Sequence, residues 1–123
     1  MAKTVLELTP EELRRYKLAG KLEVPPDTGR WERAWKVARS AAKLLRRRFG
    51  ATRVLLFGSL VDFKRFTPWS DIDLAAWGIP AGEFYRAVAM VTGLSPEFEL
   101  DLVEPETCRP GLRRRIEQEG IEL

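Results

Sequence analysis

The sequence predicts an α/β fold in which helices flank a small mixed β-sheet. Residues 30–49 carry apolar side chains at intervals of three and four, which is the pattern of one face of a helix. The short apolar run 54–57 stops at a glycine, which favours a strand buried on both faces. Residues 98–103 alternate between apolar and polar side chains, as a strand with one face on the core does. With the remaining elements described below, the expected order is helix, helix, strand, strand, helix, strand, helix, which indicates an α/β arrangement.

Composition limits the classes of function. The 123 residues suffice for one compact domain, and 45% hydrophobic residues is ordinary for a globular protein. The formal net charge of +3 is too small to indicate direct binding to nucleic acid, which we do not expect. No apolar stretch approaches the roughly 18 residues of a membrane span, so we expect a cytoplasmic protein without a membrane partner. Cys108 has no second cysteine to pair with, and the lack of histidine argues against a zinc site.

The first part of the chain is expected to form a helical arm followed by a linker. Thr9 starts a capping box with a proline at the first helical position, so a short helix should reach about Ala19. Two prolines within 24–29 then interrupt regular structure. The sequence is therefore divided into an arm with its linker, residues 1–28, and a main domain, residues 29–123.

The main domain is expected to begin with the helix at 30–49, which Gly50 ends. Arginines 46–48 close this helix, and we interpret them as solvated cations that complement the helix dipole. The elements expected after it are strands at 54–57 and 71–77, a helix at 83–91, a strand at 98–103, a helix at 110–119 and a short tail at 121–123.

Two short motifs carry residues suited to phosphate and metal chemistry. Gly58 follows a buried strand, and without a side chain it allows a phosphate to approach the backbone amides, while Ser59 adds a hydroxyl donor. Asp71 and Asp73 lie two residues apart on a strand, so their carboxylates project from the same face. Magnesium prefers oxygen ligands and is commonly held by one or two carboxylates together with substrate phosphates. These motifs therefore indicate a magnesium and phosphate site.

Asp101 is a third carboxylate, on the polar face of the strand at 98–103. Two ions about 3.5–4 Å apart, held by three such carboxylates, would steady the attacking and leaving oxygens of an in-line displacement. Plainer interpretations remain open. Glycine and serine, as at 58 and 59, are also common in simple turns. Asp101 could equally be an ordinary charged residue on the solvent-facing side of an edge strand.

The combination of Gly58-Ser59, Asp71-x-Asp73 and Asp101 resembles the signature of the DNA polymerase β-like nucleotidyltransferases. It is most similar to their minimal single-domain group, the minimal nucleotidyltransferases, over residues 31–123. The resemblance implies that Asp71, Asp73 and Asp101 are the catalytic and metal-binding residues. It implies two Mg²⁺ ions, with Mn²⁺ as a substitute, and a triphosphate held by the Gly-Ser turn. Asp101 would also help to activate the acceptor hydroxyl.

The sequence departs from the family pattern directly after Ser59. Relatives commonly continue with a small residue, an arginine and a glycine, whereas this chain has Leu60-Val61-Asp62-Phe63. Asp62 would repel a triphosphate unless it turns away or pairs with a cation. We include Lys64 and Arg65, as sources of positive charge, and Ser70 among the expected nucleotide-binding residues. Trp69 would stack on a base or form part of a partner surface, although packing in the core or within its loop is the favoured interpretation.

The resemblance implies an enzyme that transfers AMP from ATP, or another nucleotide monophosphate from its triphosphate, to a hydroxyl of a partner protein. Similar minimal proteins are typically paired with a HEPN-type ribonuclease toxin, so the chain would be the antitoxin. The helix at 9–19 and the loop around Phe66 and Trp69 are the expected docking surfaces. Two rival functions are a binding-only antitoxin with a vestigial site and a transferase acting on a small molecule, like the aminoglycoside nucleotidyltransferases.

Overall fold

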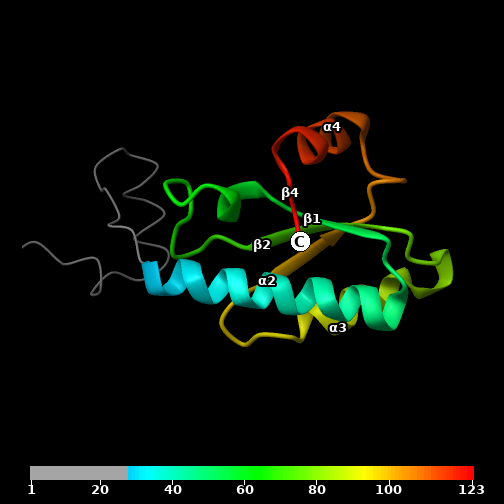
Figure 1. Ribbon diagram of the computed structural model, residues 1–123, viewed down its shortest axis with the longest axis horizontal. Helices are drawn as coiled ribbons and strands as arrows, with labels where there is room; N and C mark the ends of the chain where they lie inside the picture. The colour runs from blue at the N-terminus through cyan, green and yellow to red at the C-terminus, as the bar shows by residue number, and fades with distance from the viewer. Residues whose placement is uncertain (1–27) are drawn as a thin grey trace, which may run out of the picture.

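The computed structural model describes residues 28–123 (Figure 1). The predicted helix at 9–19 lies outside these residues, and the proposed division between arm and main domain stays a prediction. The described elements are α2 (Thr28–Phe49), β1 (Arg53–Phe57), the 3₁₀ helix η2 (Gly58–Val61), β2 (Ile72–Trp77), the 3₁₀ helix η3 (Ala81–Glu83), α3 (Phe84–Thr92), β3 (Leu100–Val103), α4 (Pro110–Glu119) and β4 (Ile121–Glu122).

The four strands form one mixed sheet in the order β3-β2-β1-β4. The central strand β1 is antiparallel to both of its neighbours, β2 and β4, whereas β2 and β3 run parallel. The parallel pair is joined by a crossover through α3, which is the usual connection between parallel strands. The predicted fold class, a small mixed sheet flanked by helices, is confirmed.

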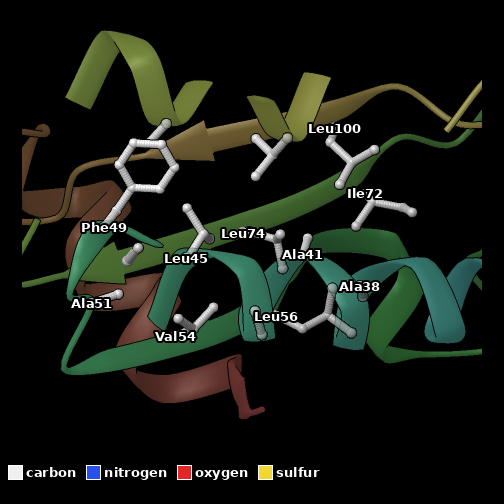
Figure 2. Packing of buried hydrophobic residues seen from close by; sticks show 14 of the residues in the cluster. Ala38, Ala41, Leu45, Phe49, Ala51, Val54, Leu56, Ile72, Leu74 and Leu100 are labelled. Atoms are coloured by element: carbon white, nitrogen blue, oxygen red, sulfur yellow. The ribbon is translucent and has the colours of Figure 1, made fainter. Parts of the chain in front are cut away.

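The main core lies between the sheet and the two helices on its first face. Figure 1 shows α2 and α3 on this side of the sheet and α4 on the other. Alanines on the inner face of α2 are fully buried, and such small side chains let the helix approach the strands closely. Residues that meet in this core include Ala38, Ala41, Leu45, Phe49, Val54, Leu56, Ile72, Leu74 and Leu100 (Figure 2).

A smaller cluster on the second face joins the sheet to α4. Leu55 from β1, Ala75 from β2 and Ile116 from α4 are its buried members. Because side chains alternate along a strand, this second face also carries Asp73 and Asp101. The second face of the sheet is therefore apolar under α4 and acidic farther along β2 and β3.

Several predicted boundaries differ from the structure. The expected tail at 121–123 is wrong, because Ile121 pairs with Leu56 and the Leu123 amide donates to the Val54 carbonyl at 3.0 Å. A strand of two exposed residues has no periodic pattern to detect. The third strand begins at Leu100 instead of residue 98. No helix among residues 28–123 is both long and apolar enough to cross a bilayer.

Candidate active site

The turn after β1 brings Gly58 against Asp73. Phe57, the last residue of β1, is the register partner of Asp73 on β2, so the chain leaving β1 passes directly beside that carboxylate. Gly58 adopts a φ of 80°, in the left-handed region that glycine tolerates best. A Cβ at this position would overlap Asp73 Oδ2 and lie 3.2 Å from Asp73 Cγ. Glycine is therefore needed here for two reasons, the backbone conformation and the space taken by the aspartate.

Asp101 occupies the position next to Asp73 on the neighbouring strand. The two are register partners in the parallel β2–β3 pair, so their side chains project from the same face of the sheet. Asp71, just before β2, is close enough for its charge to act on Asp73. The structure thus gathers the three aspartates that the sequence singled out, beside the Gly58-Ser59 turn.

The electrostatic environment of Asp73 favours its protonated form. Burial, followed by the negative charges of Asp101 and Asp71, raises the pKa of Asp73 from 3.8 to about 6. Burial and nearby like charges both disfavour the ionised form of a carboxylate and so favour the protonated form. A divalent cation bound between these carboxylates would reverse the balance and favour the ionised form.

The donor chemistry of the three aspartates fits magnesium. Hard divalent cations prefer carboxylate oxygens. The half-buried Asp73 follows Asp71 by two residues along the chain and lies opposite Asp101 on the neighbouring strand. Among residues 28–123, however, no three acidic, histidine or cysteine side chains are arranged as a ready ligand set. Asp101 is exposed. The aspartates are therefore neighbours in this structure, and metal binding requires them to draw closer.

Trp31 of α2 holds the turn that follows Gly58, a role that sequence reasoning missed. Its indole N–H donates a hydrogen bond of 3.2 Å to the Leu60 carbonyl, and its ring packs edge-to-face on Phe63 with centroids 5.4 Å apart. Leu60 itself is fully buried. The apolar periodicity placed Trp31 on the core face of a helix, but nothing in the sequence could link it to a residue 29 positions later.

The loop between η2 and β2 places the remaining predicted residues differently. Asp62 Oδ1 accepts a hydrogen bond of 3.0 Å from the Lys64 amide, so this carboxylate serves its own turn. The side chains of Lys64 and Arg65 are exposed, and neither forms an ion pair with an acidic residue of the described chain. Ser70 Oγ accepts from the Thr67 amide at 2.9 Å, which gives Ser70 a structural role. Ser70 directly precedes Asp71, so of these three residues it is the one next to an aspartate in the chain, and the nucleotide-binding roles expected for Lys64, Arg65 and Ser70 stay predictions.

A hollow of about 220 Å³ opens beside Asp71. Arg30 at the start of α2 lines it, with its guanidinium 3.7 Å from Glu97 and stacked 4.6 Å from the centre of the Phe98 ring. Trp69 lines the same hollow, so it borders the candidate site and does not belong to the main core. The complete lining is Arg30, Pro68, Trp69, Ser70, Asp71, Glu97 and Glu99. Arg30 is a second residue that the sequence did not single out.

Comparisons with known proteins agree with this arrangement. A solved structure provisionally classed as a minimal nucleotidyltransferase superposes with a TM-score of 0.60 at 26% sequence identity, covering 76% of this chain and 95% of that one. A chain from the crystal structure of the MntA–HpeT toxin–antitoxin mutant superposes with a TM-score of 0.57 at 18% identity, covering 69% of this chain and 70% of that one. No protein-family model and no curated protein matches the sequence.

At 18% identity this second likeness shows the fold alone.

Proposed function

We propose that this chain, which has the fold of the minimal nucleotidyltransferases, is a magnesium-dependent enzyme that transfers AMP from ATP to a hydroxyl of a partner protein. We further propose that the partner is a HEPN-type ribonuclease toxin and that the transfer silences it. The observation that carries the proposal is the position of Asp73, between the Gly58 turn on one side and Asp101 on the other.

Each residue has a distinct role in the proposed reaction. Mg²⁺, when bound, would neutralise the triphosphate and polarise the α-phosphate. Asp71 and Asp73 would hold the cation, and the backbone at Gly58 and Ser59 would bind the phosphate oxygens. Asp101 would accept the proton of the acceptor hydroxyl, whose oxygen attacks the α-phosphorus. A new P–O bond then forms, the bond to the bridging oxygen breaks, and pyrophosphate leaves.

Two observations support a protein acceptor. One structural neighbour comes from a toxin–antitoxin pair, that is, from a complex of proteins. In addition, Asp101 is exposed at the edge of the sheet, where a large partner can reach it.

Co-expression with the partner, followed by mass spectrometry of the partner, tests the proposal. Wild type should add the mass of one AMP group, and Asp73→Asn should abolish the addition. Glu106→Gln, which removes an exposed carboxylate outside the three-aspartate group, should transfer normally. An unmodified partner in the wild-type sample would refute enzymatic transfer.

One observation favours the rival function, a binding-only antitoxin. The segment after Ser59, residues 60–63, lacks the arginine of the family pattern and carries the acidic Asp62, and Lys64 and Arg65 form no ion pair with the aspartates in the described chain. If binding alone is the function, the partner stays unmodified and is inhibited equally by wild type and Asp73→Asn.

A further inference from the structure

Strand β3 has an open edge. It is the outer strand of the sheet, with β2 as its neighbour. The Ile72 amide donates to the Glu99 carbonyl at 2.9 Å, so Glu99 and, by alternation, Asp101 direct their backbone groups to β2. The backbone N–H and C=O groups of Leu100 and Leu102 therefore point away from β2, toward the open edge. Within residues 28–123 no other element pairs with this side of β3.

A groove of about 630 Å³ follows this edge. Helix α3 forms one wall through Val88 and Thr92, and β3 with its preceding loop forms the other. The lining residues are Val88, Thr92, Ser95, Pro96, Glu97, Phe98, Glu99, Leu100, Asp101 and Leu102. The groove therefore combines backbone groups that have no partner within residues 28–123, an apolar wall and acidic side chains.

The acidic side chains of the groove favour a positively charged ligand. Glu97 is engaged by Arg33 at 2.7 Å and by Arg30 at 3.7 Å. Glu99 and Asp101 are exposed and lie on the same face of the strand, two residues apart. No ion pair within residues 28–123 involves either of them. A basic segment complements this pair of negative charges, and a polyanion such as RNA does not.

We propose that a basic, extended segment of the acceptor protein pairs with β3 as an additional strand and presents its hydroxyl group opposite Asp101. This inference rests on the proposed function, because it describes how the acceptor reaches the site. Main-chain hydrogen bonds to Leu100 and Leu102 supply affinity, and alternate side chains supply specificity. Asp101 is the register partner of Asp73, so a hydroxyl delivered to Asp101 arrives beside the three aspartates.

Strand alternation also specifies the sequence of the segment. The hydroxyl residue faces the side of the sheet that carries Asp101, and the residue two positions away faces Glu99 and is therefore basic. The residues directly before and after the hydroxyl point to the α3 side, toward Val88 and Leu102, and are therefore apolar. The acceptor site is a hydroxyl residue between two apolar residues, with a lysine or arginine two positions from it.

Amide hydrogen exchange on the full chain tests the pairing directly. The probe is a synthetic nine-residue peptide with a central tyrosine, a valine on each side and lysines at the next positions. Exchange at the Leu100 and Leu102 amides should slow by at least tenfold on binding, whereas the Asp101 amide, which already faces β2, should change little. Unchanged Leu100 and Leu102 amides at millimolar peptide would overturn the proposal. So would protection of these amides by an RNA oligonucleotide and not by the peptide.

Two pairs of variants locate the peptide. Thr92→Trp fills the groove and should weaken peptide binding at least tenfold, whereas Ala89→Trp, at an exposed site of the same helix outside the lining, should not. Glu99→Lys should weaken binding similarly, and Glu106→Lys should leave it unchanged. Equal effects within either pair contradict docking in the groove.

The remaining outcomes separate docking from chemistry. If the peptide protects Leu100 and Leu102 but never receives AMP, the edge docking stands and the proposed function fails. If AMP is transferred without protection of these amides, the function stands and the edge docking fails. If the protein without peptide is a dimer that already protects both amides, the edge belongs to a second copy of the chain and the proposal is wrong.

Discussion

The carboxylate of Asp73 lies against the α-carbon of Gly58, with Asp73 Cγ 3.2 Å and Asp73 Cβ 3.4 Å from the position that a Cβ at residue 58 would take. This contact joins the two motifs of the sequence, the Gly-Ser turn after β1 and the paired aspartates at the start of β2. Because Gly58 and the Asp73 carboxylate are in close contact, a substitution at either position should change the stability effect of a substitution at the other.

The first prediction concerns Gly58→Ala. The substitution places a side chain at a φ of 80° and in contact with Asp73, so it should lower the free energy of unfolding by more than the roughly 1–2 kcal/mol expected for left-handed strain alone. Denaturant unfolding measures the change. Gly50→Ala is the matched control, because Gly50 has a φ of 70° but open space around its missing Cβ.

The same contact predicts coupling between the two positions. In an Asp73→Ala background the overlap is removed, so Gly58→Ala should then cost only about as much as Gly50→Ala. Additive effects in this double-mutant cycle would show that the contact with Asp73 contributes nothing.

The parts of the site that were predictable from sequence are those set by local periodicity. Asp71 directly precedes β2 and Asp73 lies within it, close to the strand expected at 71–77, and Gly58 follows a short apolar strand. Asp101 was placed on the polar face of its strand because strand side chains alternate. Its register against Asp73 was not predictable, since the pairing of β2 with β3 depends on the crossover through α3.

What the sequence missed depends on contacts between distant segments. Trp31 reaches Leu60, and Arg30 reaches Glu97 and Phe98, because α2 packs on the sheet through its buried alanines. Strand β4 was missed because two exposed residues carry no pattern. The nucleotide-binding role expected for Ser70 stays a prediction, and the sequence did not indicate that its hydroxyl also accepts a hydrogen bond from the Thr67 amide.

The second prediction is that Trp31→Phe destabilises the Gly-Ser turn. Phenylalanine keeps an aromatic ring beside Phe63 but removes the donor to the Leu60 carbonyl, which should cost about 0.5–1.5 kcal/mol. Trp35→Phe is the control, since the buried Trp35 Nε1 has no hydrogen-bond partner within the described residues. Trp35→Phe should cost less on unfolding in denaturant, and a larger loss for Trp35→Phe would contradict the assigned role of Trp31.

The third prediction is a pH dependence centred on Asp73. The fold raises the pKa of Asp73 from 3.8 to about 6, so between these pH values the folded state binds more protons than the unfolded state. In the absence of divalent cations, the contribution of Asp73 to the free energy of unfolding should therefore fall as pH rises from about 4 to about 6. It should stay low above that window.

Asp73→Asn removes this titration. Without divalent cations the variant should be more stable than wild type at pH 8, and the difference should narrow as pH falls toward 4. Asp62→Asn is the control, because Asp62 is exposed and asparagine keeps an oxygen that can accept the Lys64 N–H. Urea titrations at several pH values measure both variants, and a wild type that equals Asp73→Asn at pH 8 would contradict the prediction.

The last prediction is that Mg²⁺ or Mn²⁺ stabilises the folded protein. Burial, together with the negative charges of Asp101 and Asp71, raises the pKa of Asp73, and a cation that binds these carboxylates only in the folded state adds stability by mass action. At ten times its dissociation constant, Mg²⁺ should add about 1.4 kcal/mol, a shift of several degrees in the melting temperature for a domain of this size.

Asp71→Asn combined with Asp73→Asn should abolish the metal response while the protein stays folded. Glu106→Gln combined with Glu119→Gln removes the same amount of charge from exposed positions outside the aspartate group, so that variant should respond like wild type. Melting curves with and without Mg²⁺ compare the three proteins. Because general screening by salt would raise all three melting temperatures together, only a response confined to proteins that keep Asp71 and Asp73 supports a metal site. An equal response in all three would assign the effect to ionic strength and remove the metal from the proposed reaction.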